Sequence, residues 1–133
     1  MSDLDSVTVT ALPEQFHNHL TFYDAALGAL RLVRVAELVD EEEEHPPVEA
    51  VAWGPEGVLG VLWLIAGARP TTGLHVRLNA DSRAQVETFH AMALGAGGSQ
   101  YSAPRRWTVY RRGEFNAIVV DPAGNLVEAV APE

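Results

Sequence analysis

Cysteine is absent from the sequence. The chain therefore has no disulfide framework, no thiolate nucleophile and no cysteine-ligated metal site, and cysteine usage gives no clue to its redox compartment. Any binding or catalytic chemistry must come from histidine, carboxylates, arginine, tyrosine or the backbone.

Basic residues and long apolar runs are also scarce. Nine Lys and Arg stand against 18 Asp and Glu, for a formal net charge of −9, so neither nucleic acid nor an anionic membrane is expected as a partner. The chain begins with the acidic stretch Met1-Ser2-Asp3-Leu4-Asp5 where a secretion signal would be basic and then apolar, so we expect a cytoplasmic protein. Neither a glycine-rich phosphate loop nor a serine-hydrolase elbow occurs, which leaves nucleotide and serine-hydrolase chemistry without support.

What the sequence does contain is an internal repeat. The 133 residues, 47% of them hydrophobic, suit one compact domain. Two blocks recur 67 residues later: Phe22-x-x-x-Ala26-Leu27-Gly28-Ala29 as Phe89-x-x-x-Ala93-Leu94-Gly95-Ala96, and Pro55-x-Gly57-x-Leu59 as Pro122-x-Gly124-x-Leu126. A repeat of this length indicates two copies of one supersecondary module rather than a solenoid.

Each half predicts the same order of elements. Alternating strands over 5–11 and 74–79 are each followed by a helix with apolar residues at helical spacing, around Phe16 to Leu30 and Val86 to Leu94. Pro13 suits the start of the first helix, Ser82-x-x-Gln85 is a capping box, and Gly97-Gly98 ends the second helix. Three β-rich segments follow each helix, at 31–39, 47–53 and 58–65, and at 106–111, 115–120 and 125–131. We therefore predict an α+β fold of two βαβββ modules, about 1–66 and 74–133, joined by a linker at 67–73.

Several stretches resemble the vicinal oxygen chelate superfamily, which includes glyoxalases, bleomycin resistance proteins and extradiol dioxygenases. They are the segments Phe22–Leu27, Gly73–Leu78, Phe89–Gly98 and Asn116–Val130. The resemblance implies two βαβββ modules whose paired sheets surround a cleft, with helices on the outer faces, and it implies a homodimer. Whether one chain forms the cleft or two chains share it stays open.

The resemblance also implies four metal-ligand positions, on the first and last strand of each module. They fall on Ser6, Val61, His75 and Glu128. A catalytic divalent ion normally takes three or more protein ligands, and neither serine nor valine replaces imidazole or carboxylate. We therefore expect a degenerate metal site and no cofactor, with zinc, nickel, iron or manganese as the alternative.

Without a metal, the same residues suggest a ligand cleft. Strand alternation puts His75 and Arg77 on one face, and the resemblance places Glu128 beside them. This group is either a structural Arg77–Glu128 ion pair or an anion or carbonyl site with Glu128 or His75 as the base. Val61 and Trp63 share strand parity and would form an apolar wall opposite the polar one.

Further candidates lie on the strands and helices around these residues. Arg106 and Tyr110 resemble residues at the family's cleft mouth, and Asn116 in the closing hairpin is also expected to bind ligand. Spacing puts His17 and His19 on different helix faces, which predicts solvent exposure rather than a shared metal, and His90 is expected to be a half-buried packing residue.

The sequence thus favours a small-molecule binding protein of the glyoxalase and bleomycin resistance type. The alternative is a divalent-metal-dependent lyase or dioxygenase that uses His75 and Glu128. A third possibility is a structural dimer whose cleft no longer binds a ligand.

Overall fold

The computed structural model describes residues 6–39, 48–57, 60–107 and 113–132. The first half contains β1 (Val7–Ala11), the 3-10 turn η1 (Pro13–Gln15), α1 (Phe16–Gly28), β2 (Val33–Val39), β3 (Val48–Gly54) and β4 (Leu62–Ala66). The second half contains β5 (His75–Asn79), α2 (Arg83–Gly95), β6 (Ser99–Arg106), β7 (Glu114–Val120) and β8 (Leu126–Pro132). The predicted α+β fold of two βαβββ modules is confirmed.

Each module forms its own four-stranded mixed sheet. The N-terminal sheet has the order β1-β4-β3-β2 and the C-terminal sheet the order β5-β8-β7-β6. In both, the first and last strands of the module are parallel neighbours and the remaining pairs are antiparallel. The parallel pair therefore brings the two ends of each module's sequence to the same place in space.

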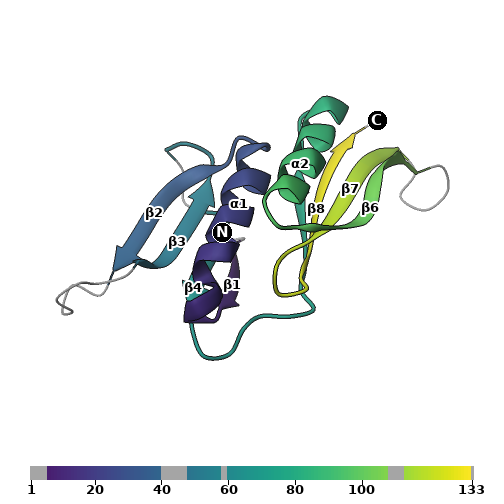
Figure 1. The fold of residues 1–133 in the computed structure, drawn as a ribbon. Helices are drawn as coiled ribbons and strands as arrows, with labels where there is room; N and C mark the ends of the chain where they lie inside the picture. Colours follow the sequence, from purple (N-terminus) through teal and green to yellow (C-terminus); the bar gives the residue numbers. More distant parts are fainter. Residues whose placement is uncertain (1–5, 40–47, 58–59, 108–112, 133) are drawn as a thin grey trace.

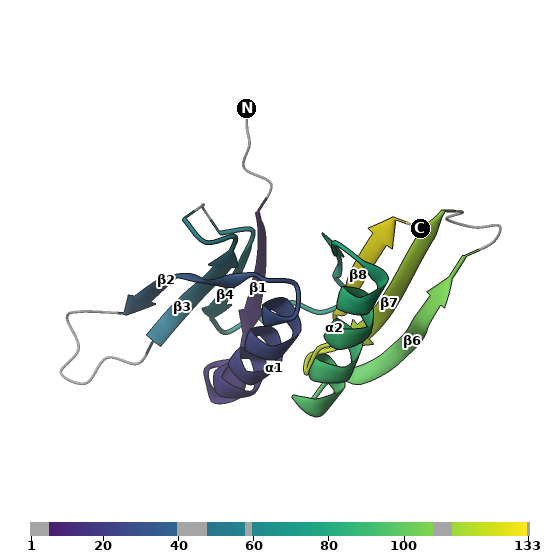
Figure 2. The ribbon, with the colours of Figure 1, turned by 90° about the horizontal axis from the view of Figure 1, so that it is seen from above.

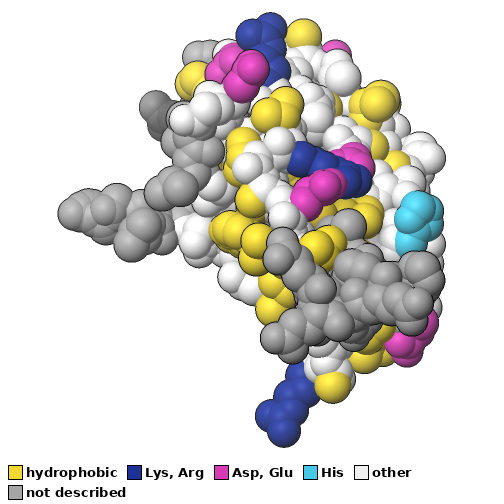
Figure 3. Space-filling view, turned by 90° about the vertical axis from the view of Figure 1, so that its left-hand side faces the viewer, with side chains coloured by type: hydrophobic (Ala, Val, Ile, Leu, Met, Phe, Trp, Pro, Cys, Tyr) yellow, Lys and Arg dark blue, Asp and Glu magenta, His cyan; other side chains and the backbone are white. Residues whose placement is uncertain are grey.

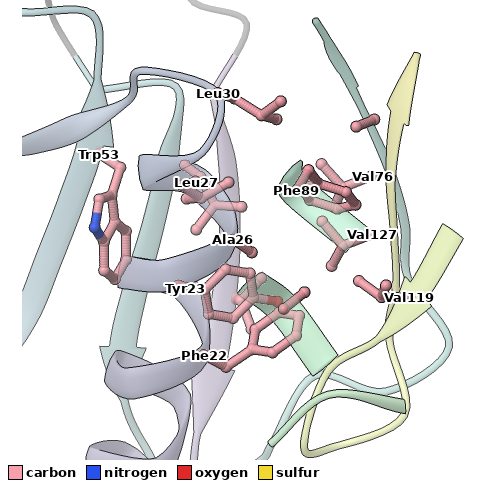
Figure 4. Packing of buried hydrophobic residues seen from close by; sticks show 14 of the residues in the cluster. Phe22, Tyr23, Ala26, Leu27, Leu30, Trp53, Val76, Phe89, Val119 and Val127 are labelled. Atoms are coloured by element: carbon pink, nitrogen blue, oxygen red, sulfur yellow. The ribbon is translucent and has the colours of Figure 1, made fainter. Parts of the chain in front are cut away.

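The two helices pack against each other between the two sheets (Figure 1; Figure 2 gives the view from above). The expectation that the helices lie on the outer faces, with the sheets around a cleft, is therefore wrong within one chain, because the apolar face of each sheet is covered by its helix. Along each strand, successive side chains point in turn toward the helix and away from it. Val76 and Val127 point toward Phe89 of α2, and Trp53 lies beside Tyr23 of α1 (Figure 4). Each sheet thus has an inner face covered by its helix and an outer face on the other side.

A buried polar contact joins the modules where α1 meets the β7–β8 turn. The Tyr23 hydroxyl donates to Oδ2 of Asp121 at 2.6 Å, across 98 residues of sequence. Burial, together with the charge and hydrogen bond of Asp121, raises the pKa of Tyr23 well above its ordinary value. Gly98 lies so close to Phe22 that a Cβ there would be 2.6 Å from Phe22 Cε1 and 2.8 Å from the Ala93 carbonyl oxygen.

The helix signals in the sequence are confirmed, and one strand prediction is wrong. Ser82 is the N-cap of α2 and accepts from the Gln85 backbone N–H, and the helix ends at Gly95, just before Gly97-Gly98. The strand expected at 106–111 is instead β6 at 99–106, and residues 108–111 lie outside the described part of the chain. β6 is a polar edge strand that contains Pro104, and an edge strand with mostly exposed side chains needs no apolar alternation.

No helix in the described ranges is long and apolar enough to cross a membrane.

Candidate functional site

The candidate site lies on the outer face of the C-terminal sheet. β5 and β8 pair in parallel with Arg77 opposite Glu128. Because Val76 and Val127 turn inward to α2, their neighbours His75, Arg77 and Glu128 turn outward. The sequence prediction that these three side chains lie together is confirmed.

Glu128 is the centre of the site and has no solvent exposure. Its Oε1 lies 2.7 Å from His75 Nε2, and its Oε2 accepts from Asn116 Nδ2 at 2.8 Å. The Nε of Arg77 is 3.4 Å from the same Oε2. Donors and a permanent positive charge therefore surround the carboxylate, which is what a buried anion needs.

Arg77 connects this buried carboxylate to a second, more exposed one. Its Nη2 donates to both carboxylate oxygens of Glu114, at 2.9 and 3.0 Å. The hydrogen bond that Arg77 donates to Glu114 and the charges of Glu128 and Glu114 raise the pKa of Arg77, against the opposing effect of desolvation. Glu114 is not among the residues predicted from the sequence, although Glu114 opens β7, the strand that carries Asn116, and points to the same face as Asn116.

Asn116 is fixed in one orientation by partners on both sides of its amide. Its Oδ1 accepts a short hydrogen bond from Trp107 Nε1 while its Nδ2 donates to Glu128. The guanidinium of Arg105 covers the Trp107 ring, with Cζ 4.2 Å from the ring centroid. Asn116 is fully buried and contacts Glu128, so its amide is not exposed on the outer face, where a ligand-binding residue was expected. We call Glu128, His75, Arg77, Glu114, Asn116 and Trp107 the polar network.

The side-chain set of the polar network does not fit a divalent cation. Within the described ranges, no group of three or more His, Asp and Glu residues could hold a metal ion. Both oxygens of Glu128 already face protein donors, and His75 and Glu128 alone fall short of the three or more protein ligands that a catalytic divalent ion takes.

The first-module candidates lie on the other sheet. Ser6 is exposed and precedes β1, and Val61 is partly buried and its carbonyl accepts from the Val7 backbone N–H. Trp63 is partly buried in β4, opposite Thr8. Since the helices lie between the sheets, the chain does not itself place the Trp63 wall against the polar network (Figure 1).

The remaining candidates have varied surroundings. Arg106 is exposed at the end of β6, and Tyr110 lies outside the described residues. His90 is partly buried, as expected, and its Nε2 lies 2.8 Å from Gln100 Oε1. His17 is exposed as predicted, but the prediction for His19 is wrong: it lies on the buried stripe of α1 and is 2% exposed.

A shallow pocket of about 290 Å³ adjoins the polar network. It is lined by Asn79, Gly113, Glu114, Val130, Ala131 and Pro132. A larger hollow of about 500 Å³ lies along β2 and is lined by Val33, Arg34, Val35, Glu56 and Gly57. Arg34 in this lining is already bound to Asp24 and Glu37, whereas the smaller pocket contains Glu114 of the polar network.

Comparison with protein-family models gives no match, and comparison with curated proteins gives none. Solved structures do match. A glyoxalase/bleomycin resistance protein from Albidiferax ferrireducens T118 is 23% identical with a TM-score of 0.72, over 99% of this chain and 100% of that one. A glyoxalase/bleomycin resistance protein/dioxygenase family enzyme from Burkholderia phytofirmans PsJN is 14% identical with a TM-score of 0.66, over 99% and 100%.

A third match is TnmS3, described as an antibiotic binding protein from Streptomyces sp. CB03234. It is 17% identical, with a TM-score of 0.64 over 100% of this chain and 98% of that one. The chain therefore has the paired-module fold of the glyoxalase, bleomycin resistance and dioxygenase proteins, as its resemblance to the vicinal oxygen chelate superfamily predicted.

Proposed function

We propose that this chain is a small-molecule binding protein of the glyoxalase and bleomycin resistance type, and that the outer face of the C-terminal sheet holds the ligand without a metal. One observation carries the proposal: a fully buried carboxylate, Glu128, holds two partly exposed side chains that can bond to a ligand. His75 and Arg77 keep 37% and 43% of their side-chain surface exposed while fixed at one end by Glu128. Side chains held in this way lose little entropy when a ligand binds.

In this proposal Arg77 supplies the positive charge that a metal ion supplies in a metalloenzyme. It compensates Glu128 and is held in place by Glu114. The antibiotic-binding protein of the same fold supports small-ligand binding as a role for such a site.

The geometry also favours a cleft shared between two copies. The outer face of the N-terminal sheet is largely apolar, with Trp63, Ile65 and Leu38, and Leu38 is 54% exposed. Figure 3 shows the side of the molecule that carries β2 and β3, where hydrophobic side chains gather on part of the surface. A second copy that places this face over the polar network would bury it and complete a two-walled cleft.

The binding proposal is tested by a thermal-shift screen of small organic molecules. A ligand that binds the folded chain raises its stability by about 2.7 kcal/mol at 100 times its Kd. We expect compounds whose shift is lost in His75→Ala and kept in the matched control His90→Ala, because His90 lies on α2, away from the network. No shift with any compound, or equal shifts in His75→Ala, would overturn the proposal and favour a structural dimer.

The shared cleft is tested by mixing two binding-deficient variants, Trp63→Ala and His75→Ala. If each cleft takes one wall from each copy, a mixed dimer contains one intact cleft and one with both changes. Exchange of subunits then restores binding to about a quarter of the sites. If one chain forms the whole cleft, mixing restores none.

A metal-dependent lyase or dioxygenase is the second candidate, favoured by the direct approach of His75 to Glu128. It requires a third ligand in addition to these two residues.

A further inference from the structure

We propose that the edge strand β2 is a docking surface for β2 of a second copy of the chain, with the two strands antiparallel across a two-fold axis. The contact joins two N-terminal sheets edge to edge. It is separate from the proposed shared cleft, because it uses the edge of the sheet and leaves the outer face open. The inference therefore does not rest on the proposed function.

β2 is an open edge strand that carries exposed apolar side chains. It pairs with β3 on one side only and lies at the end of the N-terminal module away from the C-terminal sheet (Figure 1, Figure 2). Val33, Leu38 and Val39 are 44%, 54% and 41% exposed, and they are three of the five large hydrophobic side chains that the described ranges leave exposed. An open edge with apolar side chains is a template for pairing with another strand.

A bulge in β2 places its two charged side chains on the same face. The register with β3 shifts between Arg34 and Ala36, so that Arg34 lies opposite Trp53 and Glu37 lies opposite Val51. Both of these β3 residues point into the core on the side of α1. The 2.6 Å hydrogen bond from Arg34 Nη1 to Glu37 Oε1 agrees with this placement.

The apolar side chains Val33 and Leu38 lie on the opposite face of the same strand. Val33 is opposite Gly54 and Leu38 is opposite Ala50, and these β3 positions alternate with the ones that point into the core. β2 therefore has one charged pair on the face of α1 and one apolar pair on the outer face.

This arrangement makes β2 complementary to itself in the reverse direction. When Val33 faces the second copy's Leu38, Arg34 faces the second copy's Glu37, and the two-fold axis repeats both pairs. Facing residues of an antiparallel pair share one face of the sheet, and both pairs meet that condition. A slip of one residue sets Arg34 against Leu38, which lies on the other face.

The charges already present allow the contact without an unpaired group. Arg34 Nε and Nη2 donate to Asp24, and Nη1 donates to Glu37. A guanidinium has five N–H groups, so Arg34 keeps donors for a second carboxylate, and the Glu37 side chain is 49% exposed. Opposite charges thus alternate along the contact, as cross-strand pairs require. Figure 3 views this side of the molecule, where side chains of both charges lie beside hydrophobic ones.

The outer edge of the C-terminal sheet lacks this complementarity. β6 contains Pro104, which has no N–H to give to another strand, followed by Arg105 and Arg106, which have the same charge. These are features that protect a strand edge from pairing. β2 contains no proline and carries one residue of each charge, so of the two strands β2 is the one suited to a second copy.

Cross-linking tests the register, and the absence of native cysteine removes any background. Val33→Cys and Leu38→Cys are made in separate chains, mixed and oxidised. Facing Cα atoms of antiparallel strands are about 4.5–5.5 Å apart, which a disulfide can span. The same residue in the two copies is about 17 Å apart along the strand. We expect cross-linked dimer in the mixture and little in either chain alone.

Light scattering tests the charge pairing in the whole chain. Glu37→Arg sets arginine against arginine at both pairs, so the mass of the assembly should fall to about half. Glu87→Arg makes the same charge change at an exposed position on α2 and should keep the wild-type mass. Circular dichroism confirms that both variants are folded.

Three results would overturn the inference. Cross-linking of Val33→Cys with Val39→Cys in place of Leu38→Cys would establish the slipped register, which does not pair Arg34 with Glu37. An unchanged mass in folded Glu37→Arg would remove the charge pairing. The absence of any cross-link in the mixture would reject docking at β2, while the mixing experiment on the shared cleft judges that cleft independently.

Discussion

Arg77 bonds to two carboxylates of very different exposure, and a pair of double-mutant cycles measures how much each bond contributes to stability. The cycles are Arg77→Met with Glu128→Gln, and Arg77→Met with Glu114→Gln. The Glu114 contact is the shorter, at 2.9 Å against 3.4 Å, but Glu114 is 31% exposed and Glu128 is not exposed at all. Distance alone therefore predicts stronger coupling to Glu114, and burial predicts stronger coupling to Glu128.

The magnitudes follow from the screening of each pair. At 3.4 Å two unit charges interact by about 1 kcal/mol in water and about 5 kcal/mol at an effective dielectric constant near 20. Because the guanidinium of Arg77 is partly exposed, the attraction between Arg77 and Glu128 lies between these limits, and the cost of desolvating Glu128 reduces its net contribution to stability. We expect coupling of about 1–3 kcal/mol to Glu128 and about 0.2–1 kcal/mol to Glu114.

The assay is urea unfolding followed by circular dichroism, for the wild type, the three single variants and the two double variants. Arg77→Met alone should be clearly destabilising, because it leaves Glu128 buried without its cation. Equal couplings, or a larger one to Glu114, would show that Glu128 is not the electrostatic centre of the site.

Three further changes test the packing between and within the modules. Because the pKa of Tyr23 is raised in the folded state, the stabilisation provided by its hydroxyl is complete below the ordinary tyrosine pKa of about 10 and is lost as the pH rises above that value. Tyr23→Phe should therefore reduce the loss of unfolding free energy above that pH, as measured by denaturant titrations. The buried Nε2 of His19 has no hydrogen-bond partner in the described structure, so His19→Leu should raise the free energy of unfolding in urea by up to about 1 kcal/mol. A lower free energy of unfolding would show that this nitrogen does not destabilise the folded chain. Gly98→Ala should lower the melting temperature because its Cβ would overlap Phe22, whereas Gly95→Ala, with open space around it, should leave it unchanged or raise it.

The local signals in the sequence predicted most of the fold. The Ser82 cap and the strand alternation at His75 and Arg77 depend only on neighbouring residues, and both are found as expected. β6 was misplaced because an exposed edge strand has no apolar period to detect. His19 was misjudged because exposure was inferred from residue type and spacing, whereas the helix turns that position toward the core.

The site was predicted only in part, because its contacts depend on which strands pair. His75, Arg77 and Glu128 were brought together by the resemblance, but the register that puts Glu114 beside Arg77 and Trp107 beside Asn116 is a property of the folded sheet. Sequence spacing alone cannot supply that register, since one residue of slip turns every side chain to the other face.

Elemental analysis of the untagged protein is the sharpest test of whether the chain binds its ligand without a metal. The same sample is titrated with nickel, zinc, iron(II) and manganese while its melting temperature is followed. We predict less than stoichiometric metal and no shift with any of the four ions, because Glu128 is bonded within the protein and the described residues around it include no group of three metal-ligating side chains. Stoichiometric metal that is lost in His75→Ala would contradict metal-free binding and make the lyase or dioxygenase the leading function.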